Sequence, residues 1–331
     1  MTSVTIYEVA ERAGVSITTV SHSLNNPARV RPQTREKVFA AIDELGFVPR
    51  SEAVARARRG VGRIGVLAPL TAYASFQERL RGVIDALRPT TMELVLYDQE
   101  SLAVRADYLS SLPLSNRLDG LIVMSLPFDD DVARRLRSRR LPTVVVEFAR
   151  DGYSSVRIDD FRGGRLAAEH LAARGHEHIA FVGEAKASVR VQDQATRRVA
   201  GVAAALADAG LALADELVSF GEYGVESARR QAAQLLDLDH PPTAVIAHSD
   251  TQAVGVLKAA RERGLRVPDD LAVIGFDDLD IAEHMGITTI AQPLVESGRV
   301  AARLLLDQLA EPSTPAKEIF LPLELVVRET T

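Results

Sequence analysis

The spacing of hydrophobic and polar positions changes near residue 62. In residues 1–46 the apolar residues recur every three to four positions, which is typical of amphipathic helices. From Arg63 onward, short apolar runs alternate with amphipathic stretches, which predicts strands alternating with helices. We therefore expect an all-helical head followed by an α/β core.

Three helices are predicted in the head. Gly14 ends the first, Ser16 can cap the second, and the third starts near Pro32 and ends at Gly46. Their inner faces are formed by Ile6, Val9, Ala10 and Ala13, by Val20, Ser23 and Leu24, and by Val38, Ala41, Ile42 and Leu45. A small residue on the first helix and a glycine at the tight turn are the pattern of a helix-turn-helix.

The outer face of the second helix is the candidate for reading DNA. Ile17, Thr18, Ser21 and His22 lie on this face, away from the predicted core. A recognition helix contacts base edges with its N-terminal residues, which here are Ile17 and Thr18. The alternative is an N-terminal helical bundle with no role in DNA binding.

The core pattern predicts two doubly wound subdomains. Strands are expected at 64–67, 94–97, 121–124, 143–146, 179–182, 244–247 and 273–276. Helices are expected at 76–87, 162–173, 197–209, 225–236, 250–263 and 294–309. Such alternation indicates parallel sheets covered on both faces. About 270 residues is long for one sheet, and the pattern divides near residues 155–161. Ligands bind these folds at the carboxyl ends of strands, so a cleft between the subdomains is expected.

Composition and charge refine this picture. The chain is 47% hydrophobic and 25% charged, and it has no cysteine, which excludes disulfides, cysteine metal sites and thiol nucleophiles. Residues 1–60 carry nine basic and six acidic residues, a net of +3, whereas the remainder carries 30 and 39, a net of −9. A basic head on an acidic body suggests that the head meets a polyanion. With neither a signal-peptide pattern nor a long apolar run, a cytoplasmic protein is expected.

Two motifs resemble ligand sites but lack the required context. The G-x-G-x-x-G run at residues 60–65 enters a strand, whereas a dinucleotide fingerprint follows one. His176 and His178 lack a third metal ligand. Without a nucleophile elbow, a P-loop or a catalytic carboxylate pair, we expect no enzyme activity, cofactor or metal. A transport solute-binding protein would share the core, but it would need an export signal and no DNA-binding head.

Several segments together resemble the LacI/GalR family of regulators. They are residues 4–10, 13–16, 19–21, 24–25 and 34–38 in the head, and residues 198–201, 267–278 and 288–293 in the core. The resemblance covers essentially the whole chain, in order. It implies a helix-turn-helix head, a hinge and a core like the type I periplasmic sugar-binding proteins. It also implies a homodimer on a near-palindromic operator, since two-fold protein symmetry matches two half-sites.

The resemblance also assigns DNA contacts. The positions matching phosphate-backbone contacts are Thr5, Tyr7, Ser16, Thr19, Ser21, Asn25 and Thr34. The positions matching base-reading residues are Ile17, Thr18 and His22. His22 departs from the family, where arginine is common. Arginine reads guanine with two donors, whereas a neutral histidine offers one donor or acceptor at a time.

An effector site is expected in the core. Arg198 offers a rigid fork of donors, and Asp277 can accept hydrogen bonds from vicinal hydroxyls, which suits a polyol or a carboxylate-bearing ligand. By resemblance, the same cleft is lined by Phe76, Ser125, Glu147, Phe161, Tyr223, Ser249, Asp250 and Gln292. Tyr223 matches an aromatic that stacks on the ligand. Asp250 could instead cap the helix that follows it.

The hinge departs from the family pattern. We expect the head at 1–46, the hinge at 47–61 and the effector-binding and dimerisation core at 62–331. Related regulators commonly wedge a hinge leucine into the minor groove, but the matching position here is Ala57 or Arg58. Arg56 and Arg58 are therefore expected to contact DNA by charge, with Arg59 beside them. The alternative is that these arginines only tether the joint in solvent.

Overall fold

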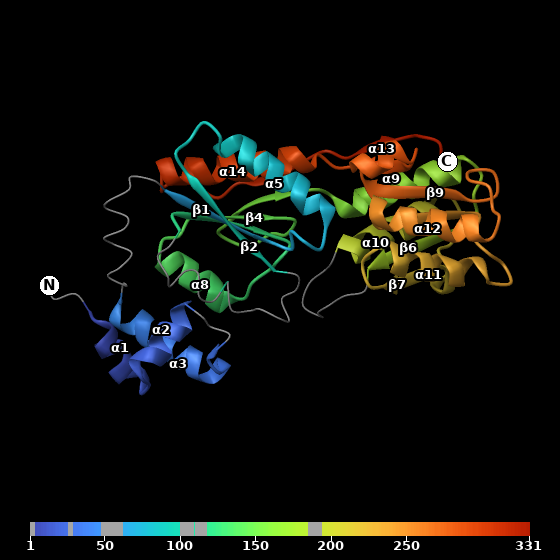
Figure 1. Cartoon of the computed structure of the whole chain (residues 1–331). Coiled ribbons are helices and arrows are strands. Elements are labelled where there is room, and N and C mark those ends of the chain that lie inside the picture. The colour runs from blue at the N-terminus through green and yellow to red at the C-terminus, as the bar shows by residue number, and fades with distance from the viewer. Residues whose placement is uncertain (1–3, 26–28, 48–61, 100–108, 110–117, 185–193) are drawn as a thin grey trace. The chain divides into compact units, whose positions relative to one another are not determined.

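The computed structural model describes residues 4–25, 29–47, 62–99, 109, 118–184 and 194–331. Its internal contacts divide the chain into two units (Figure 1). Unit 1 comprises Met1–Val156 and Val295–Ile319, and unit 2 comprises Arg157–Leu294 and Phe320–Thr331. The break after Val156 falls within the predicted 155–161 segment. The chain returns to unit 1 at Val295 and to unit 2 at Phe320, so both units are discontinuous in sequence.

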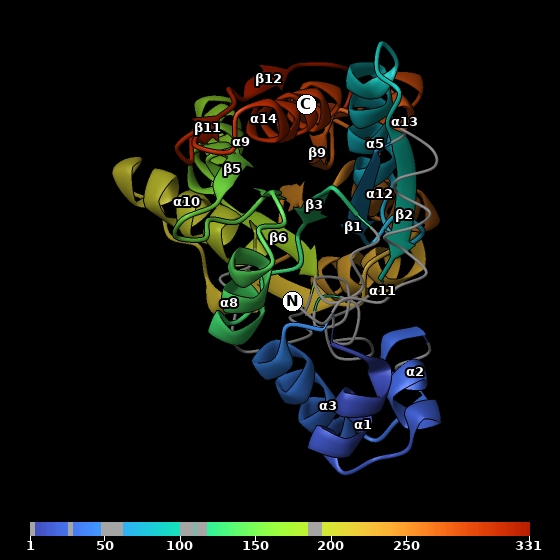
Figure 2. The ribbon, with the colours of Figure 1, turned by 90° about the vertical axis from the view of Figure 1, so that its left-hand side faces the viewer.

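The head is the three-helix cluster seen at the blue end of the chain in Figure 2. Its helices are α1 (Ile6–Ala13), α2 (Ile17–Asn25) and α3 (Pro32–Leu45). Gly14 and Gly46 both adopt left-handed backbone conformations at the ends of α1 and α3, as glycine readily does. The buried core of the head consists of Val9, Ala10, Val20, Val38, Phe39, Ala41, Ile42 and Phe47. The predicted inner faces of the three helices are therefore largely confirmed.

Unit 1 contains a six-stranded sheet. Its strands are β1 (Arg63–Ala68), β2 (Glu93–Asp98), β3 (Gly120–Met124), β4 (Thr143–Val146), β5 (Ser154–Arg157) and β11 (Glu318–Phe320), in the order β11-β5-β4-β3-β1-β2. The neighbours from β2 to β5 pair in parallel. Its helices include α5 (Ala74–Leu87), α8 (Asp130–Ser138) and α14 (Leu294–Ala310).

Unit 2 repeats the same arrangement. Its strands are β6 (Ile179–Glu184), β7 (Val218–Gly221), β8 (Ala244–Ala247), β9 (Ala272–Asp277), β10 (Thr288–Ala291) and β12 (Glu324–Val326), in the order β12-β10-β9-β8-β6-β7. Its helices are α9 (Asp160–Ala173), α10 (Gln194–Asp208), the 3₁₀ turn η2 (Asp215–Leu217), α11 (Val225–Leu236), α12 (Asp250–Glu262) and α13 (Asp280–His284). The strand β12 runs antiparallel to β10, and the other pairs are parallel.

The shared strand order is the doubly wound one, in which the first strand of each unit lies between the second and the third. Ligands bind such sheets beyond the carboxyl ends of the strands, at the point where the strand order reverses. That point lies between β1 and β3 in unit 1 and between β6 and β8 in unit 2. The predicted fold class, a helix-turn-helix head with two doubly wound subdomains, is confirmed.

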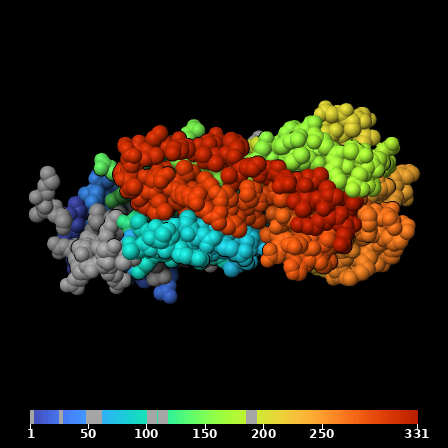
Figure 3. Space-filling model, turned by 90° about the horizontal axis from the view of Figure 1, so that it is seen from above, coloured from blue at the N-terminus to red at the C-terminus, as the bar shows by residue number. Residues whose placement is uncertain are grey.

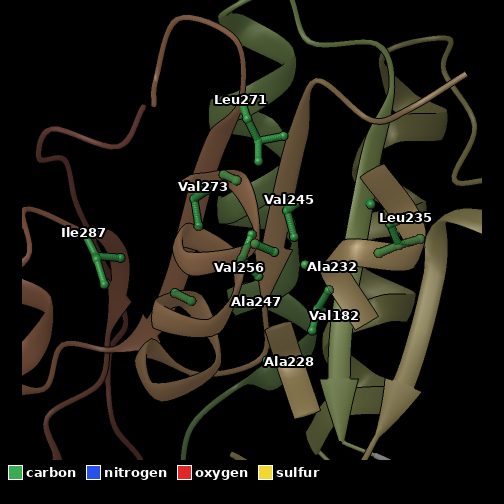
Figure 4. Close-up of a cluster of buried hydrophobic side chains, with 14 of the residues drawn as sticks. Val182, Ala228, Ala232, Leu235, Val245, Ala247, Val256, Leu271, Val273 and Ile287 are labelled. Atoms are coloured by element: carbon green, nitrogen blue, oxygen red, sulfur yellow. The ribbon is translucent and has the colours of Figure 1, made fainter. Parts of the chain in front are cut away.

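The central strands are held by helices on their faces. In unit 2, Val182, Val245 and Val273 from three neighbouring strands pack against Ala228, Ala232 and Val256 of α11 and α12 (Figure 4).

Glycines allow two helix pairs to approach backbone to backbone. A Cβ on Gly82 of α5 would lie 1.8 Å from the carbonyl oxygen of Val295 at the start of α14. Figure 3 shows these two helices side by side on one face.

Among the described residues, no helix is long and apolar enough to cross a membrane.

Candidate DNA-binding and effector-binding sites

The turn between α1 and α2 is built by local hydrogen bonds. Thr5 and Glu8 form a capping box at the start of α1, with the Thr5 Oγ1 accepting from the Glu8 amide. Ser16 caps α2, since its Oγ accepts from the Thr19 amide at 3.1 Å. Ser23 is fully buried, and its hydroxyl donates to the Thr19 carbonyl at 2.8 Å. These contacts fix which face of α2 points outward.

The predicted base-reading residues occupy the outward face. Ile17 is 40% exposed although it is a large apolar residue, and Thr18 is also exposed. Ser21 and His22 are half-buried on the same helix. Tyr7 on α1 is 68% exposed. An N-terminal end of a helix that presents apolar and hydroxyl side chains to solvent is the arrangement with which a recognition helix enters the major groove.

The predicted phosphate-contacting residues are placed as follows. Thr5, Ser16 and Thr19 use their hydroxyls in the caps, and the Ser16 and Thr19 hydroxyls lie 2.9 Å apart. The Thr5 hydroxyl donates its only proton to the Glu8 carboxylate, so a phosphate contact from Thr5 requires this bond to break. Ser16 and Thr19 use one hydroxyl proton between them, which leaves the other available for a phosphate. Thr34 is half-buried in the first turn of α3. The Asn25 side chain and the hinge residues Arg56 and Arg58 lie outside the described part of the chain.

The predicted effector residues are found in both units, mostly where strands end. In unit 1 they are Phe76 on α5, Ser125 after β3 and Glu147 after β4. In unit 2 they are Phe161 on α9, Arg198 on α10, Tyr223 after β7, Ser249 and Asp250 at the start of α12, Asp277 at the end of β9, and Gln292 after β10.

Backbone strain gathers at these strand ends. Among the described non-glycine residues, a positive φ occurs at Ser125, Arg140, Glu147, Asp277 and Asp278. Three of the five are predicted effector residues. Such conformations persist only where the surrounding structure enforces them, and they cluster at functional sites. The strained backbone thus coincides with predicted effector residues at the ends of β3, β4 and β9.

In unit 1 two of the three predicted residues, Phe76 and Glu147, contact Arg79 of α5. Its Nη2 lies 2.6 Å from the Glu147 carboxylate, and the Arg79 side chain is almost fully buried. The guanidinium also lies 5.2 Å from the Phe76 ring centre, within cation–π range. Phe76 in turn makes an edge-to-face contact with Tyr73. Arg79 therefore fixes the direction of Glu147 and neutralises its charge.

In unit 2 the guanidinium of Arg198 is held from several sides. Its Nε donates to the Asp160 carboxylate at 3.0 Å, and both side chains are nearly buried. Its Nη1 donates to the His248 carbonyl at 2.6 Å and lies 3.3 Å from the His248 Nδ1. The plane rests on the Phe276 ring, 3.4 Å from its centre. Arg198 is thus pre-oriented, and Asp160 compensates its charge.

His248 follows β8 directly. Desolvation and then the neighbouring positive charge of Arg198 lower the pKa of His248 well below its usual value. The imidazole is therefore neutral. Because Nδ1 accepts from Arg198, the ring proton lies on Nε2, which leaves that nitrogen as a donor. A neutral donor beside a charge-compensated guanidinium suits hydroxyl and carbonyl groups.

Asp277 and Tyr223 supply the other polar contacts. The Gln292 amide donates to Asp277 Oδ1 at 2.5 Å, which fixes the carboxylate at the end of β9. The Tyr223 hydroxyl is hydrogen-bonded to Thr251 and Ser249, and burial raises its pKa. An oriented carboxylate and a half-buried aromatic are the usual partners of vicinal hydroxyls and an apolar sugar face.

Asp250 is placed differently from its predicted partners. It is fully buried, and its two oxygens accept from the Leu279 amide at 2.8 Å and the Thr289 hydroxyl at 2.6 Å. Burial, and secondarily the Asp277 charge, raise the pKa of Asp250 to about 8. Its contacts tie α12 to the segment after β9 and to β10, so the structure supports a positioning role rather than a direct ligand contact.

Sequence reasoning missed Arg79, Asp160 and His248, which orient the predicted residues. His248 offered a signal, since it directly follows a predicted strand. Arg79 and Asp160 lie in helical stretches where a charge ordinarily faces solvent, so they offered none. His176, half of the rejected metal pair, is hydrogen-bonded through Nδ1 to Thr243 at 3.0 Å. No group of three or more metal-ligating side chains occurs among the residues that the structure describes.

Two family models match the chain. The one described as bacterial regulatory proteins of the lacI family matches residues 5–50, and the one described as a periplasmic binding protein-like domain matches residues 168–331. The first covers the head, and the second begins within α9 and covers the rest of unit 2.

Similar proteins match over nearly the full length. The transcriptional repressor CytR of Escherichia coli is 32% identical over 100% of this chain and 97% of its own. A solved complex of the transcriptional regulator CelR with cellobiose has 31% identity, a TM-score of 0.72, and coverage of 99% and 100%. The lac repressor dimer bound to operator and the anti-inducer ONPF has 28% identity, a TM-score of 0.70, and coverage of 100% and 99%.

These relatives are transcriptional regulators rather than enzymes, and they share both the head and the core. The resemblance inferred from the sequence motifs is thereby confirmed. With a lacI-type head, a periplasmic-binding-protein-like core and full-length relatives above 30% identity, this chain belongs to the LacI family of transcriptional regulators.

Proposed function

We propose that this protein is a cytoplasmic, homodimeric repressor whose affinity for operator DNA is controlled by a small hydroxylated effector, a sugar or sugar derivative. One observation supports the DNA role above all: α2 is capped by Ser16, buries Val20 and Ser23, and exposes Ile17 and Thr18. In this proposal Ile17, Thr18 and His22 read bases, and the cap hydroxyls and Tyr7 meet phosphates.

The effector proposal rests on the chemistry of the strand ends. Arg198 and Arg79 each lie against a carboxylate, so neither presents an uncompensated charge to an anionic ligand. The remaining groups, Asp277, Tyr223 and His248, suit neutral hydroxyls. We assign the effector to the polar groups at the carboxyl ends of the core strands, where the resemblance to the family implies a ligand site. The CelR complex with cellobiose supports this assignment, since that relative binds a sugar.

The domain boundaries and the hinge belong to the same proposal. We assign residues 1–46 to DNA binding, 47–61 to the hinge and 62–331 to effector binding and dimerisation. Arg56 and Arg58 would enter the minor groove by charge rather than as a wedge. Operator affinity measured against salt should then lose about 0.9 units of slope for each arginine contact removed.

The test is a mobility shift of genomic fragments upstream of neighbouring genes, with the full chain. We expect specific retardation that a neutral sugar such as cellobiose or another member of a sugar panel alters in either direction. Ile17→Ala and Thr18→Ala should each abolish the preference for the operator, whereas Glu36→Ala, which is exposed on α3, should retain it. Fragments that remain unshifted, or shifts that both α2 variants leave intact, would contradict the proposal.

A further inference from the structure

A run of arginines forms a strongly positive surface at the C-terminal half of α8. We call it the α8 arginine surface, and it comprises Arg134, Arg135, Arg137, Arg139 and Arg140. The acidic residues of this helix, Asp129 to Asp131, lie at its other end. Although the net charge of the chain is −6, this surface carries five guanidinium groups within seven residues.

The carboxylates around this surface do not balance it. Arg134 pairs with Asp131 at 2.8 Å, and Arg135 and Arg139 share Asp43 of the head at 3.6 and 3.4 Å. Across the described residues, three of the five guanidinium groups thus form ion pairs, and they share two carboxylates. Arg134, Arg137 and Arg140 are exposed, and the Arg134 side chain retains 70% of its accessible area.

Chain topology places the surface at the edge of unit 1 from which the head is tethered. The helix α8 connects the carboxyl end of β3 to the amino end of β4, and these strands are parallel. The end of α8 therefore lies at the amino edge of the sheet. Strand β1 starts at the same edge, at Arg63, and residues 48–61 join it to the head.

Contacts with the head agree with this placement. The Arg139 Nη1 lies 3.5 Å from the Phe47 carbonyl, and the Arg135 guanidinium lies 5.5 Å from the Phe39 ring centre. Both aromatic residues belong to the core of the head. The half-buried arginines of the surface, Arg135 and Arg139, thus contact the head, and the other three are exposed to solvent.

The dipole of α8 explains why some of these five arginines are present. Cations in the last turn of a helix interact favourably with its C-terminal carbonyls, which accounts for Arg135 and Arg137. It does not account for Arg134, which faces solvent earlier in the helix, or for Arg140, which lies beyond the helix end. A guanidinium fork matches the geometry of a phosphate group, and an excess of such forks attracts a polyanion.

We propose that the α8 arginine surface contacts the phosphate backbone of DNA that flanks the half-site held by the head. This inference rests on the proposed role of the head in DNA binding. Its contacts are electrostatic, carry no base specificity, and add to the salt dependence of binding to any duplex.

The test uses the full chain and a mixed-sequence duplex of 40 base pairs without an operator. Its dissociation constant is measured between 50 and 200 mM KCl for the wild type and for the triple variant Arg134→Gln, Arg137→Gln, Arg140→Gln. We expect the plot of log affinity against log salt to lose between one and three units of slope, at about 0.9 per contact. Affinity at 50 mM should fall at least tenfold.

Two further variants make the result specific. The triple variant Arg174→Gln, Arg230→Gln, Arg261→Gln removes the same charge from exposed positions of unit 2, and it should keep the wild-type slope. Replacing Arg134, Arg137 and Arg140 with lysine should retain the slope, because charge is preserved. Equal losses in both glutamine variants, or no loss in either, would overturn the inference. A wild type that binds no duplex, operator included, would instead refute the role of the head, and this inference with it.

Discussion

Burial of the Asp250 carboxyl group makes the stability of the protein depend on pH. Its pKa is about 8 in the folded chain, against an unfolded value of 3.8. Between these values the folded state holds a proton that the unfolded state has lost, so the free energy of unfolding falls as pH rises. His248 acts in the opposite direction, since its lowered pKa costs stability only as pH falls below about 6.5. Of these two groups, Asp250 therefore makes the larger contribution to the pH dependence of the free energy of unfolding between pH 6.5 and 8.

We predict that Asp250→Asn flattens this part of the stability profile. An asparagine cannot ionise, and it can still accept from the Leu279 amide and donate to the Thr289 hydroxyl. Relative to the wild type, the variant should gain about 1 kcal/mol per pH unit between pH 6.5 and 8. Urea unfolding at several pH values measures this difference. Parallel profiles for the two proteins would show that Asp250 remains ionised.

Arg198 has a structural role that any binding experiment must separate from ligand contact. We predict that Arg198→Ala lowers the free energy of unfolding by about 3–5 kcal/mol, because it leaves Asp160 buried without its cation. Adding Asp160→Asn should recover part of that loss. Chemical denaturation of the two single variants and the double variant gives the coupling. Strictly additive losses would mean that the pair is not coupled.

Asp277 is a second residue with which to probe effector binding, and its carboxylate accepts from the Gln292 amide. We predict that Asp277→Ala weakens the binding of the responding sugar by roughly 2–4 kcal/mol, the range for losing a charged hydrogen-bonding partner. Calorimetry measures this, and the unfolding midpoint serves as the control for folding. Unchanged affinity would remove Asp277 from the site.

The sequence could predict the effector residues at strand ends, but not the residues that hold them in position. Arg198, Asp277 and Gln292 stand next to recognisable motifs. By contrast, Asp160 meets Arg198 only because α9 and α10 pack together, 38 residues apart. A buried ion pair leaves no mark in the spacing of either helix. For the same reason the burial of Asp250 could not be distinguished from a helix cap beforehand.

Close contact between α9 and α10 depends on two glycines. A Cβ on Gly201 would lie 2.0 Å from the Phe161 carbonyl, and one on Gly164 would lie 2.0 Å from the Arg198 carbonyl. The helices therefore meet through their backbones, next to both predicted effector residues. Any side chain added there must push them apart.

We predict that Gly201→Ala destabilises the protein by about 1–3 kcal/mol, the usual cost of overpacking. Helix propensity alone predicts the opposite sign, a gain of up to about 1 kcal/mol. Ala207→Gly, at an exposed position of the same helix, measures propensity without a clash. Thermal unfolding of both variants decides between the two effects. A stabilised Gly201→Ala variant would mean that the helices can separate without cost.

Secondary structure was predictable where strands carry apolar runs. Of the seven predicted strands, six lie inside their sheets, namely β1, β3, β4, β6, β8 and β9. The seventh, β2, lies at an edge and was still recognisable by its apolar run. The five strands that were not predicted, β5, β7, β10, β11 and β12, lie at or next to an edge. For example, β5 reads Ser-Ser-Val-Arg, and β11 and β12 have three residues each. Short or polar strands have no periodicity from which to be recognised.

The division of the core was predicted near residues 155–161, but the two later returns of the chain were not. The return at Val295 occurs at the start of α14, whose amphipathic pattern resembles that of any covering helix. The return at Phe320 falls on the last residue of the short edge strand β11. Neither brings a change of composition, so the sequence alone could not show to which sheet these segments belong.

We predict that a chain beginning at Val61 folds and dimerises but does not bind operator. Strand β1 starts at Arg63, and the buried cluster of the head is made of head residues alone. Sedimentation and circular dichroism should give the signatures of a folded dimer, and mobility shifts with operator should be absent. Retained operator binding would show that the head does not carry recognition.

The interleaved order of the two units also bears on biosynthesis. Strand β5 pairs with β11, which ends at Phe320, and β10 pairs with β12, which ends at Val326. The two sheets are therefore completed only when the ribosome has passed these residues. The head, whose core ends at Phe47, can fold roughly 280 residues earlier. At typical translation speeds of 5–20 residues per second, this interval is roughly 15–60 s. For that time a nascent chain presents a finished head on an unfinished core. Its head can reach only one half-site at a time, so newly made molecules would be unable to occupy an operator as dimers until synthesis is nearly complete.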